Sequence, residues 1–467
     1  MNSIFDAKQV HLIGIGGISM SSIAQILVER GIEVSGSDQA ESKTIKELRK
    51  NGVHVTIGHS AENIKEQDLV IFTGAVDDTN PEMIRAKQKH IPIVPRTVAL
   101  NDILQLHKSI IAISGTHGKT TTTSIATQIM RAEEGDISYL IGAHLFETGK
   151  AYHLSDCSTV TVEACEYQAN FLHLYPTTIV VNNIEPEHMD YYKSIAQLVD
   201  TFRTFANNLP PDGHLIINRD DENASRLLDH KTAITTFAID SEADYQAKNI
   251  QYCDATKTAF DLYIKGAYQT TLELPLMGKF NVYNALAAIT ACHLNGAELN
   301  TISNVLKTFV NSDRRFEKIG TYKGAPVISD YAHHPSEVKA TIDDAAKLPN
   351  SDLCVVFQPH TYSRTANMID DFATAFENAD HVFIADIYAA REDNIYNISS
   401  KDLTSAIAQS GKTAHYIGEL KKIPQKLAEI ITDKTLIIMM GAGSIDAFAR
   451  QVKRKSESVK VKCVKNQ

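Results

Sequence analysis

The sequence has few cysteines, and they are scattered along the chain: Cys157, Cys165, Cys253, Cys292, Cys354 and Cys463. No two of them form a CxxC pair, so neither a disulfide framework nor a thiolate zinc site is indicated, and free thiols in a reducing compartment are expected. No apolar run approaches the roughly 20 residues that cross a bilayer, and no basic segment with a signal-like apolar stretch opens the chain. These absences predict a cytoplasmic protein without membrane insertion.

Basic residues are not in excess either. Forty-six Lys and Arg against 56 Asp and Glu give a net charge of -10, which argues against nucleic acid as a partner. Residues 453–467 are basic and lack hydrophobic periodicity, and they are predicted to form a frayed tail. A small phosphate ligand remains compatible with the net charge, because the charge of a whole molecule does not fix the sign of one cleft.

The length of 467 residues exceeds what one hydrophobic core usually supports, and about three domains are expected. Short apolar runs alternate with longer amphipathic stretches, which is typical of βα units in parallel sheets. We therefore predict an α/β protein with domain boundaries near residues 106 and 313. The predicted strands cover 10–15, 32–35, 69–73 and 91–94, then 109–115, 159–164, 178–184 and 214–221, then 326–335, 353–360, 381–388 and 435–444; residues 232–276 read as strand-rich and irregular, and 281–294 as a helix.

The first polar cluster is the segment GIGGISM at 14–20, directly after a predicted strand. Gly14 and Gly16 permit a tight turn and the close approach of a phosphate, and Asp38, at the end of the next strand, is placed to bind ribose hydroxyls. Ser19 stands where the dinucleotide fingerprint has its third glycine. A purely structural turn is as good a reading as a ligand site, and a ligand could be NAD or a nucleotide sugar.

The second cluster is ISGTHGKTTTT at 113–123, where an apolar strand meets a glycine loop that opens a helix. Gly115 and Gly118 free the backbone to wrap phosphates, Lys119 offers a cation, and Thr120 can bind Mg²⁺. Ile113 stands where the GxxxxGK[ST] loop has its first glycine. Strand placement and the intact GKT favour a nucleoside triphosphate site over a plain turn.

Candidate metal ligands follow two further strands. Glu163 and Glu166 lie in VEACEYQANF at 162–171, and His188 lies in NNIEPEHMD at 182–190. Glu163 ends a run of β-branched residues, where a solvated charge would be out of place. Ordinary solvated loop carboxylates are the preferred interpretation for Glu185, Glu187 and Asp190.

The last third of the chain places four cationic or imidazole side chains near strand ends or a domain junction. These are Arg315, His333, His360 and Arg364. They suit carboxylate or phosphate recognition, although each alone is more often a surface contact. Their clustering at one predicted sheet edge favours function.

The motifs together resemble one known family, the Mur ligases. The matching segments run in family order over residues 14–445: GIGGISMS, SGSD, GTHGKTTTT, EACEY, NIEPEHMDYY, GKFNVYNALAA, RRFE, DYAHHP, FQPHTYSRT, DIYAARE and MGAGSI. The resemblance implies a UDP-sugar-binding Rossmann-like domain (1–106), a central P-loop-type ATPase domain with a mostly parallel sheet (107–313) and a C-terminal Rossmann-like α/β domain that binds the amino acid and closes the site (314–467, with the basic tail 453–467). It implies ATP- and Mg²⁺-dependent joining of L-alanine to the lactyl carboxylate of UDP-N-acetylmuramic acid through an acyl phosphate, in peptidoglycan biosynthesis.

The resemblance also implies roles for individual residues. UDP-sugar binding falls to Gly14, Gly16, Gly17 and Asp38; ATP binding to Gly115, Thr116, His117, Gly118, Lys119, Thr120, Thr121, Asn281, Asn284, Arg315 and Asp330; Mg²⁺ binding to Thr120, Glu163 and His188; binding of the amino acid and acyl phosphate to His333, His360 and Arg364; and catalysis to Lys119, Glu163, His188, His333 and Arg364. Phe280 stands where many relatives have histidine. No lysine occurs between Lys193 and Lys231, so the carbamylated lysine of several sister ligases is not predicted.

Three alternatives stay open at this point. One is the recycling ligase that attaches a whole murein tripeptide to the same UDP-sugar. The others are a nicotinamide oxidoreductase, which leaves the GKT loop unexplained, and a non-catalytic nucleotide sensor. A monomer or a homodimer is expected.

Overall fold

The computed structural model describes residues 3–145, 147–189, 191–254, 257–311, 315–348, 352–390, 392–432 and 434–451. The predicted basic tail, Cys463, Asp190 and the predicted boundary at 313 lie outside these residues. The described residues form three sheets in two compact units. The first unit comprises Met1–Ile250, Phe260–Glu273 and Val282–Ser312, and the second comprises Gln251–Ala259, Leu274–Asn281 and Asp313–Gln467.

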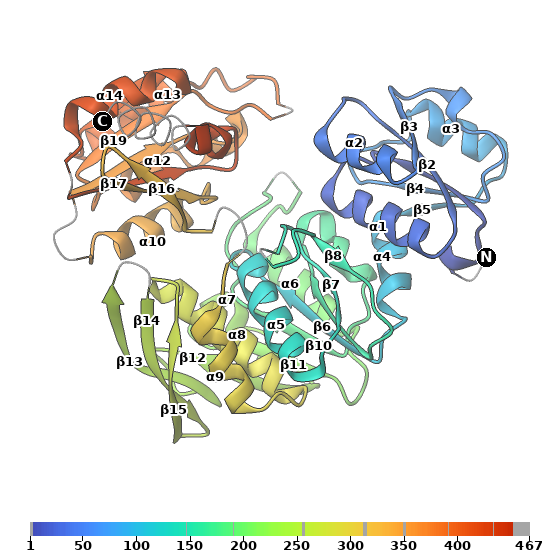
Figure 1. Ribbon diagram of the computed structural model, residues 1–467, viewed down its shortest axis with the longest axis horizontal. Coiled ribbons are helices and arrows are strands. Elements are labelled where there is room, and N and C mark those ends of the chain that lie inside the picture. Colours follow the sequence, from blue (N-terminus) through green and yellow to red (C-terminus); the bar gives the residue numbers. More distant parts are fainter. Residues whose placement is uncertain are drawn as a thin grey trace, which may run out of the picture. The chain divides into compact units, whose positions relative to one another are not determined.

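The first sheet is fully parallel, with the strand order β3-β2-β1-β4-β5 (Figure 1). From β1 the chain adds β2 and β3 on one side and β4 and β5 on the other, so the order of the strands reverses at β1. Parallel α/β sheets bind ligands beyond the carboxyl ends of the strands at such a reversal. The GIGGISM loop begins at this point. The strands are β1 (Gln9–Ile13), β2 (Glu33–Asp38), β3 (His54–Ile57), β4 (Leu69–Phe72) and β5 (Ile93–Pro95), and the helices are η1 (Ile4–Asp6), α1 (Ile18–Glu29), α2 (Lys43–Lys50), η2 (Ala61–Asn63), α3 (Pro81–Gln88) and α4 (Arg96–Leu104).

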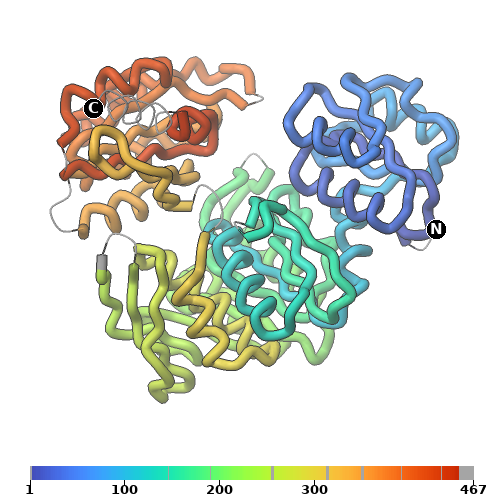
Figure 2. The backbone as a smooth tube through the Cα atoms, in the orientation of Figure 1, coloured from blue at the N-terminus to red at the C-terminus, as the bar shows by residue number. Residues whose placement is uncertain are grey.

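The second sheet has ten strands, in the order β15-β14-β13-β12-β11-β10-β6-β9-β7-β8. The chain enters it from α4 through residues 105–108 (Figure 2). The strands are β6 (Ser109–Ser114), β7 (Ser138–Leu140), β8 (Tyr152–His153), β9 (Thr159–Glu163), β10 (Thr178–Val181), β11 (His214–Asn218), β12 (Ala233–Ala238), β13 (Tyr245–Asp254), β14 (Lys257–Ile264) and β15 (Ala267–Leu274). The helices are α5 (Lys119–Glu134), η3 (Tyr167–His173), α6 (Ile195–Ala206), α7 (Glu222–Ser225), α8 (Lys279–Leu294) and α9 (Leu299–Thr308).

Strand β6 lies between β9 and β10 and pairs with both in parallel. Its last five residues are buried, so the phosphate loop that follows it starts from a rigid strand. Helix α5 buries threonines rather than aliphatic residues in its first turns. The hydroxyls of Thr123 and Thr127 each donate to the carbonyl four residues earlier, at 2.8 and 2.7 Å. These bonds give the buried hydroxyls hydrogen-bond partners within the helix.

The third sheet has the order β16-β17-β21-β18-β19-β20, with only β16 antiparallel to its neighbour. Strand β21 is buried along its whole length, as expected for a central parallel strand. The strands are β16 (Glu317–Tyr322), β17 (Ala325–Asp330), β18 (Asp352–Phe357), β19 (His381–Ala385), β20 (Ala414–Gly418) and β21 (Thr435–Met440), and the helices are α10 (Pro335–Ala345), α11 (Tyr362–Asn367), α12 (Ile369–Ala375), α13 (Ser400–Gln409), η4 (Leu420–Lys422) and α14 (Ile423–Ile430).

The predicted α/β class with mostly parallel sheets is confirmed. Each predicted strand has a counterpart, whereas β3, β7, β8, β16 and β20 were not predicted. Residues 232–276 resolve into four strands, β12 to β15, at one end of the second sheet. In the described part of the chain, no helix is long and apolar enough to span a membrane.

Candidate active site

The phosphate loop connects β6 to α5 and depends on two glycines with positive φ. Gly115 has φ +134° and Gly118 has φ +79°, and Gly118 is the N-cap of α5. A Cβ atom at Gly118 would overlap the Asn284 side-chain oxygen, so glycine is required there for space as well as for conformation. The amides of the first turn of α5 therefore remain available to an anion.

Two asparagines that we did not predict hold this loop in shape. The Asn183 side-chain oxygen accepts a hydrogen bond from the His117 amide at 2.7 Å, and its carbonyl accepts one from the Thr116 amide at 3.0 Å. Asn182 donates to the Thr122 hydroxyl at 2.9 Å. Both asparagines directly follow the buried strand β10, and that position was the signal that could have identified them.

Lys119 lies close to its own loop and to a buried carboxylate. Its Nζ donates to the carbonyls of Gly115 (2.6 Å) and Thr116 (2.9 Å) and lies 2.9 Å from Glu166 Oε2. Burial lowers the pKa of Lys119, but the charge and hydrogen bonds of Glu166, together with the charge of Glu163, outweigh burial and leave the pKa above its usual range. The Lys119 side chain is only 13% exposed, so its head group is enclosed by the loop carbonyls and Glu166 and not surrounded by solvent.

Thr120 and Glu163, two of the three predicted magnesium ligands, are in direct contact. The Thr120 hydroxyl donates to Glu163 Oε2 at 2.9 Å, and the Gly142 amide donates to the same oxygen at 3.0 Å. A Cβ at Gly142 would lie 2.9 Å from both carboxylate oxygens, so the carboxylate is closely held. A hydroxyl and a carboxylate oxygen at the end of the phosphate loop form a donor set that fits Mg²⁺.

His188, the third predicted metal ligand, lies next to Glu166. Its Nε2 is 3.7 Å from Glu166 Oε1, and its ring lies 4.6 Å from that of Tyr167. His188 has a positive φ of 57°, which for a residue other than glycine is uncommon and typical of functional sites. Glu166, which we considered only as a candidate metal ligand, contacts both Lys119 and His188, and the sequence did not predict these contacts.

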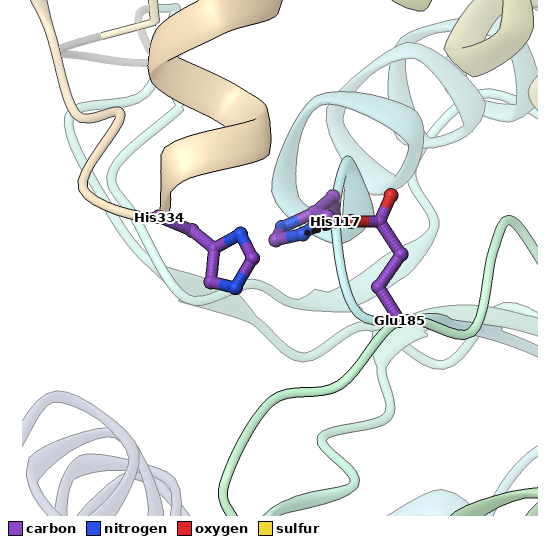
Figure 3. Close-up of side chains that lie close together, drawn as sticks. All are labelled: His117, Glu185 and His334. Carbon is purple, nitrogen blue, oxygen red and sulfur yellow. Dashed lines mark ion pairs between the residues drawn. The ribbon is translucent and has the colours of Figure 1, made fainter. Parts of the chain in front are cut away.

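His117 forms an ion pair within the first unit. Its Nε2 lies 3.5 Å from Glu185 Oε2, the contact marked by the dashed line in Figure 3. Figure 3 also draws His334, which belongs to the second unit, where it is the N-cap of α10.

The interpretation of Glu187 as a solvated loop carboxylate is wrong, because its side chain is buried.

Asn281 and Asn284, both predicted to lie on the adenine side, are buried near the start of α8. Asn281 donates to the Met277 carbonyl at 2.7 Å. Asn284 accepts from the Thr122 hydroxyl at 3.3 Å and faces Gly118. Asn284 therefore supports the phosphate loop directly.

The glycine loop of the first sheet is held by Asp38. Gly14 has φ +79° and donates to the Ser37 carbonyl at 2.8 Å, and the Gly16 amide donates to Asp38 Oδ2 at 2.8 Å. Gly17 is the N-cap of α1 and provides no side-chain cap. Asp38, which we expected to bind ribose, thus closes the loop in this structure, and the first amides of α1 lack a side-chain partner.

In the second unit, Arg315 and Asp330 lie near the start of the third sheet. The Asp330 carboxylate accepts hydrogen bonds from the Ala332 and Phe316 amides, both at 2.8 Å. Burial raises the pKa of Asp330 above its usual value, and the amides and Arg315 offset part of this effect. The Arg315 guanidinium lies 4.9 Å from the centre of the Tyr331 ring.

His333, His360 and Arg364, which come from two different strand ends, lie together in the second unit. The rings of His333 and His360 are 5.9 Å apart, and Arg364 Nη1 lies 3.2 Å from His360 Nδ1. The Tyr388 ring stacks on His360 at 5.7 Å, a contact that the sequence analysis missed. The cluster follows β17 and β18, so the expectation that these residues share one sheet edge is met.

Comparison with family models assigns most of the chain to one family. Residues 9–108 match the catalytic domain of the Mur ligase family, residues 113–292 the Mur ligase middle domain, and residues 314–443 the glutamate ligase domain of the Mur ligases. This chain belongs to the Mur ligase family.

Within that family, curated relatives of one kind match nearly the whole chain. A UDP-N-acetylmuramate–L-alanine ligase of Clostridium acetobutylicum is 40% identical over 440 residues, which cover 94% of this chain and 96% of that protein. A ligase of the same name from Alkaliphilus metalliredigens is 40% identical over 446 residues, which cover 95% and 97%.

Solved structures agree with this assignment. The crystal structure of a UDP-N-acetylmuramate–alanine ligase from Thermotoga maritima matches with a TM-score of 0.81 at 27% identity, covering 97% of this chain and 99% of that one. A murein peptide ligase from Psychrobacter arcticus matches with a TM-score of 0.69 at 23% identity, covering 95% and 98%, and shows the shared fold.

Proposed function

We propose that this chain is an ATP-dependent ligase that joins L-alanine to the lactyl carboxylate of UDP-N-acetylmuramic acid in peptidoglycan biosynthesis. The observation that carries the proposal is the 40% identity to UDP-N-acetylmuramate–L-alanine ligases over 94% of the chain. The phosphate loop with its buried lysine supports it, because amide formation from a carboxylate needs an activating phosphoryl group. The tripeptide-recycling alternative is not favoured, because the curated relatives at about 40% identity are named UDP-N-acetylmuramate–L-alanine ligases, whereas two solved murein peptide ligases are 23% and 27% identical.

The reaction has two steps. A lactyl carboxylate oxygen attacks the γ-phosphorus of ATP, which forms an acyl phosphate and releases ADP. The alanine nitrogen then attacks the acyl carbon, phosphate leaves, and the nitrogen loses a proton. Phosphoryl transfer needs charge neutralisation and alignment more than a protein nucleophile, and Lys119 with the first amides of α5 would provide both for ATP.

We assign Mg²⁺ to the Thr120 hydroxyl and the Glu163 carboxylate, with His188 as a third group. When bound, the ion would neutralise phosphate charge during transfer. The 2.9 Å contact between Thr120 and Glu163 supports this assignment. Glu163→Gln is expected to lower kcat and to raise the Mg²⁺ concentration needed for half-maximal turnover, whereas Glu222→Gln, in the solvated first turn of α7, is a control expected to change neither.

The remaining assignments follow the predicted organisation. Residues 1–106 would bind the UDP-sugar through Gly14, Gly16, Gly17 and Asp38. Residues 107–313 would bind ATP through the phosphate loop, with Arg315 and Asp330 of residues 314–467 completing the nucleotide contacts. His333, His360 and Arg364 would bind L-alanine and the acyl phosphate. We propose a monomer or homodimer in the cytoplasm, where ATP and nucleotide sugars are made.

Phosphate release from ATP tests the function. The purified chain is given ATP, Mg²⁺ and UDP-N-acetylmuramic acid, and free amino acids are scanned one at a time beside the murein tripeptide. Release that depends on L-alanine, with UDP-N-acetylmuramoyl-L-alanine identified by mass, is expected. Release with the tripeptide and not with L-alanine would identify the recycling ligase, and ATP binding without release would identify a sensor.

A further inference from the structure

Arg96 reaches the glycine loop of the first sheet from a neighbouring strand. It is the first residue of α4 and directly follows β5. Its Nη1 donates to the Ser19 hydroxyl at 2.9 Å. Ser19 lies in the first turn of α1, two residues after Gly17, so a partly buried guanidinium lies beside the loop that precedes this helix.

Arg96 has no counter-ion in the part of the chain that the structure describes. The Ser19 hydroxyl is its hydrogen-bond partner there, and no carboxylate oxygen lies within ion-pair distance. Three other arginines of the first unit pair with carboxylates: Arg49 with Glu41 at 2.8 Å, Arg131 with Glu147 at 3.1 Å and Arg203 with Asp229 at 2.5 Å. Burial lowers the pKa of Arg96, and the nearby Cys165 thiol offsets part of this effect.

A desolvated guanidinium without an anion is unfavourable, and it has four further N–H donors to satisfy. Two helix N-termini add positive potential at the same place. Neither Gly17, the N-cap of α1, nor Pro95, the N-cap of α4, provides a side-chain cap. The loop, the guanidinium and the two helix ends therefore select an oxyanion, and more than one oxyanion oxygen can be bound at once.

We propose that Arg96, positioned by Ser19, binds the diphosphate of the UDP-sugar. The inference rests on the proposed function and adds a cation to a loop that otherwise offers only backbone amides. It also gives Ser19 a role where the dinucleotide fingerprint has glycine. The substrate carries a second oxyanion, the lactyl carboxylate, but the place of Arg96 beside the glycine loop and the start of α1 favours the phosphates.

Isothermal titration without ATP tests the proposal on the full chain. The ligands are uridine, UDP and UDP-N-acetylmuramic acid, and the proteins are wild type, Arg96→Gln, Ser19→Ala and the control Arg85→Gln on α3, whose guanidinium contacts Gln88. We expect Arg96→Gln to weaken UDP and UDP-N-acetylmuramic acid by the same factor, roughly 10- to 100-fold, because charge-assisted hydrogen bonds are lost. Ser19→Ala should weaken both by a few-fold, and uridine binding and Arg85→Gln should be unchanged.

Three results would overturn the proposal. If Arg96→Gln weakened the binding of UDP-N-acetylmuramic acid but not of UDP, Arg96 would bind the lactyl carboxylate. If the variant bound both ligands as tightly as wild type, Arg96 would not be part of the site. Wild-type protein that binds UDP no more tightly than uridine would show that the diphosphate has no site here.

Thermal unfolding separates binding from a structural role. Because Arg96→Gln removes a desolvated charge that lacks a counter-ion, its melting temperature should equal or exceed that of wild type, and a clear fall would indicate a structural arginine. Failure of the proposed function is distinguishable, since it would appear as absent L-alanine-dependent phosphate release in wild type, whereas the UDP titration needs no turnover.

Discussion

At the scale of single residues, Lys119 has two consequences for the protein. Its ammonium group is the cation of the phosphate loop, and it also neutralises Glu166, whose side chain is 1% exposed. As the loop cation Lys119 serves ATP turnover, and as the partner of Glu166 it serves the stability of the fold. Substitutions of the two residues can separate these two effects.

Lys119→Met is expected to lower phosphate release roughly 100-fold or more, because the cation that stabilises phosphoryl transfer is lost. It should also lower the free energy of unfolding by about 1–3 kcal/mol, because Glu166 is left buried without its partner. Steady-state kinetics and urea unfolding measure the two effects.

The double variant Lys119→Met, Glu166→Gln is the matched control for this prediction. It removes the buried charge together with its partner, so stability should recover while turnover stays low. A double variant as unstable as Lys119→Met alone would show that the ion pair does not account for the loss.

Glu82 is a second buried carboxylate, at the start of α3 and far in sequence from the phosphate loop. It is fully buried and accepts hydrogen bonds from Ser37 at 2.6 Å and Asn63 at 2.5 Å. His59 Nδ1 lies 3.0 Å from its Oε2, and His11 Nε2 lies 3.6 Å from its Oε1. Burial raises the pKa of Glu82, but His11, Ser37 and Asn63 outweigh burial and lower it to about 2.

The lowered pKa of Glu82 predicts a specific pH dependence. Since the folded-state pKa is about 2 against an ordinary 4.5, the stabilisation is present above pH 4.5 and is lost as the pH falls towards 2. Glu82→Gln should therefore be less stable than wild type at pH 7, by roughly 1–3 kcal/mol. The difference should narrow from pH 4.5 to pH 2, as measured by urea unfolding across that range. A difference that is constant with pH would contradict the assignment.

At the scale of elements, β6, the phosphate loop and α5 form one unit whose shape depends on Gly118. Gly118→Ala would place a side chain at φ +79° and against the Asn284 oxygen. We expect ATP binding, measured by calorimetry, to weaken tenfold or more, because the loop amides move away from their positions on the phosphates.

The other end of α5 provides a control for this substitution. Gly135 has φ +92°, and a Cβ there would meet no atom within 4 Å. Gly135→Ala therefore introduces backbone strain of about 1–3 kcal/mol without touching the loop. It should lower stability and leave ATP affinity unchanged. An equal loss of ATP affinity in both variants would mean that general destabilisation, and not the loop, is responsible.

The sequence predicted those elements that carry strong local signals. Long apolar strands such as β6 and β21 were found, because burial on both faces leaves a continuous apolar run. The short strands β3 and β7 and the exposed edge strand β20 have weak patterns, and only pairing with a neighbour defines them. Strand β16 is a largely unburied, antiparallel edge strand, so neither a continuous apolar run nor a βα alternation indicates it.

Individual contacts were less predictable than the motifs that contain them. The GTHGKT motif indicated the phosphate loop. It did not indicate that Lys119 would contact Glu166, because this contact depends on how β9 and η3 position the Glu166 carboxylate. Arg96 follows an ordinary strand and belongs to no glycine motif. Its significance appears only when the fold places it beside Ser19 without a carboxylate partner.

At the scale of the whole molecule, the phosphate loop belongs to the first compact unit and the cluster of His333, His360 and Arg364 belongs to the second. The family models likewise assign these residues to separate matches. Phosphate binding at the loop and amino-acid use at this cluster should therefore respond to different substitutions, even though one reaction needs both.

Arg364→Ala tests this separation. Arg364 contacts His360, and its guanidinium suits a carboxylate or a phosphoryl oxygen. The variant should raise the KM for L-alanine roughly 10- to 100-fold and lower kcat, whereas ATP affinity, measured by calorimetry without the other substrates, should stay within twofold of wild type. Lys426→Ala, at an exposed position of α14 in the same unit, controls for surface charge and should change neither quantity. If Arg364→Ala weakened ATP binding as much as it weakened L-alanine use, the cluster would serve the nucleotide, and the assignment of the amino acid to these residues would be wrong.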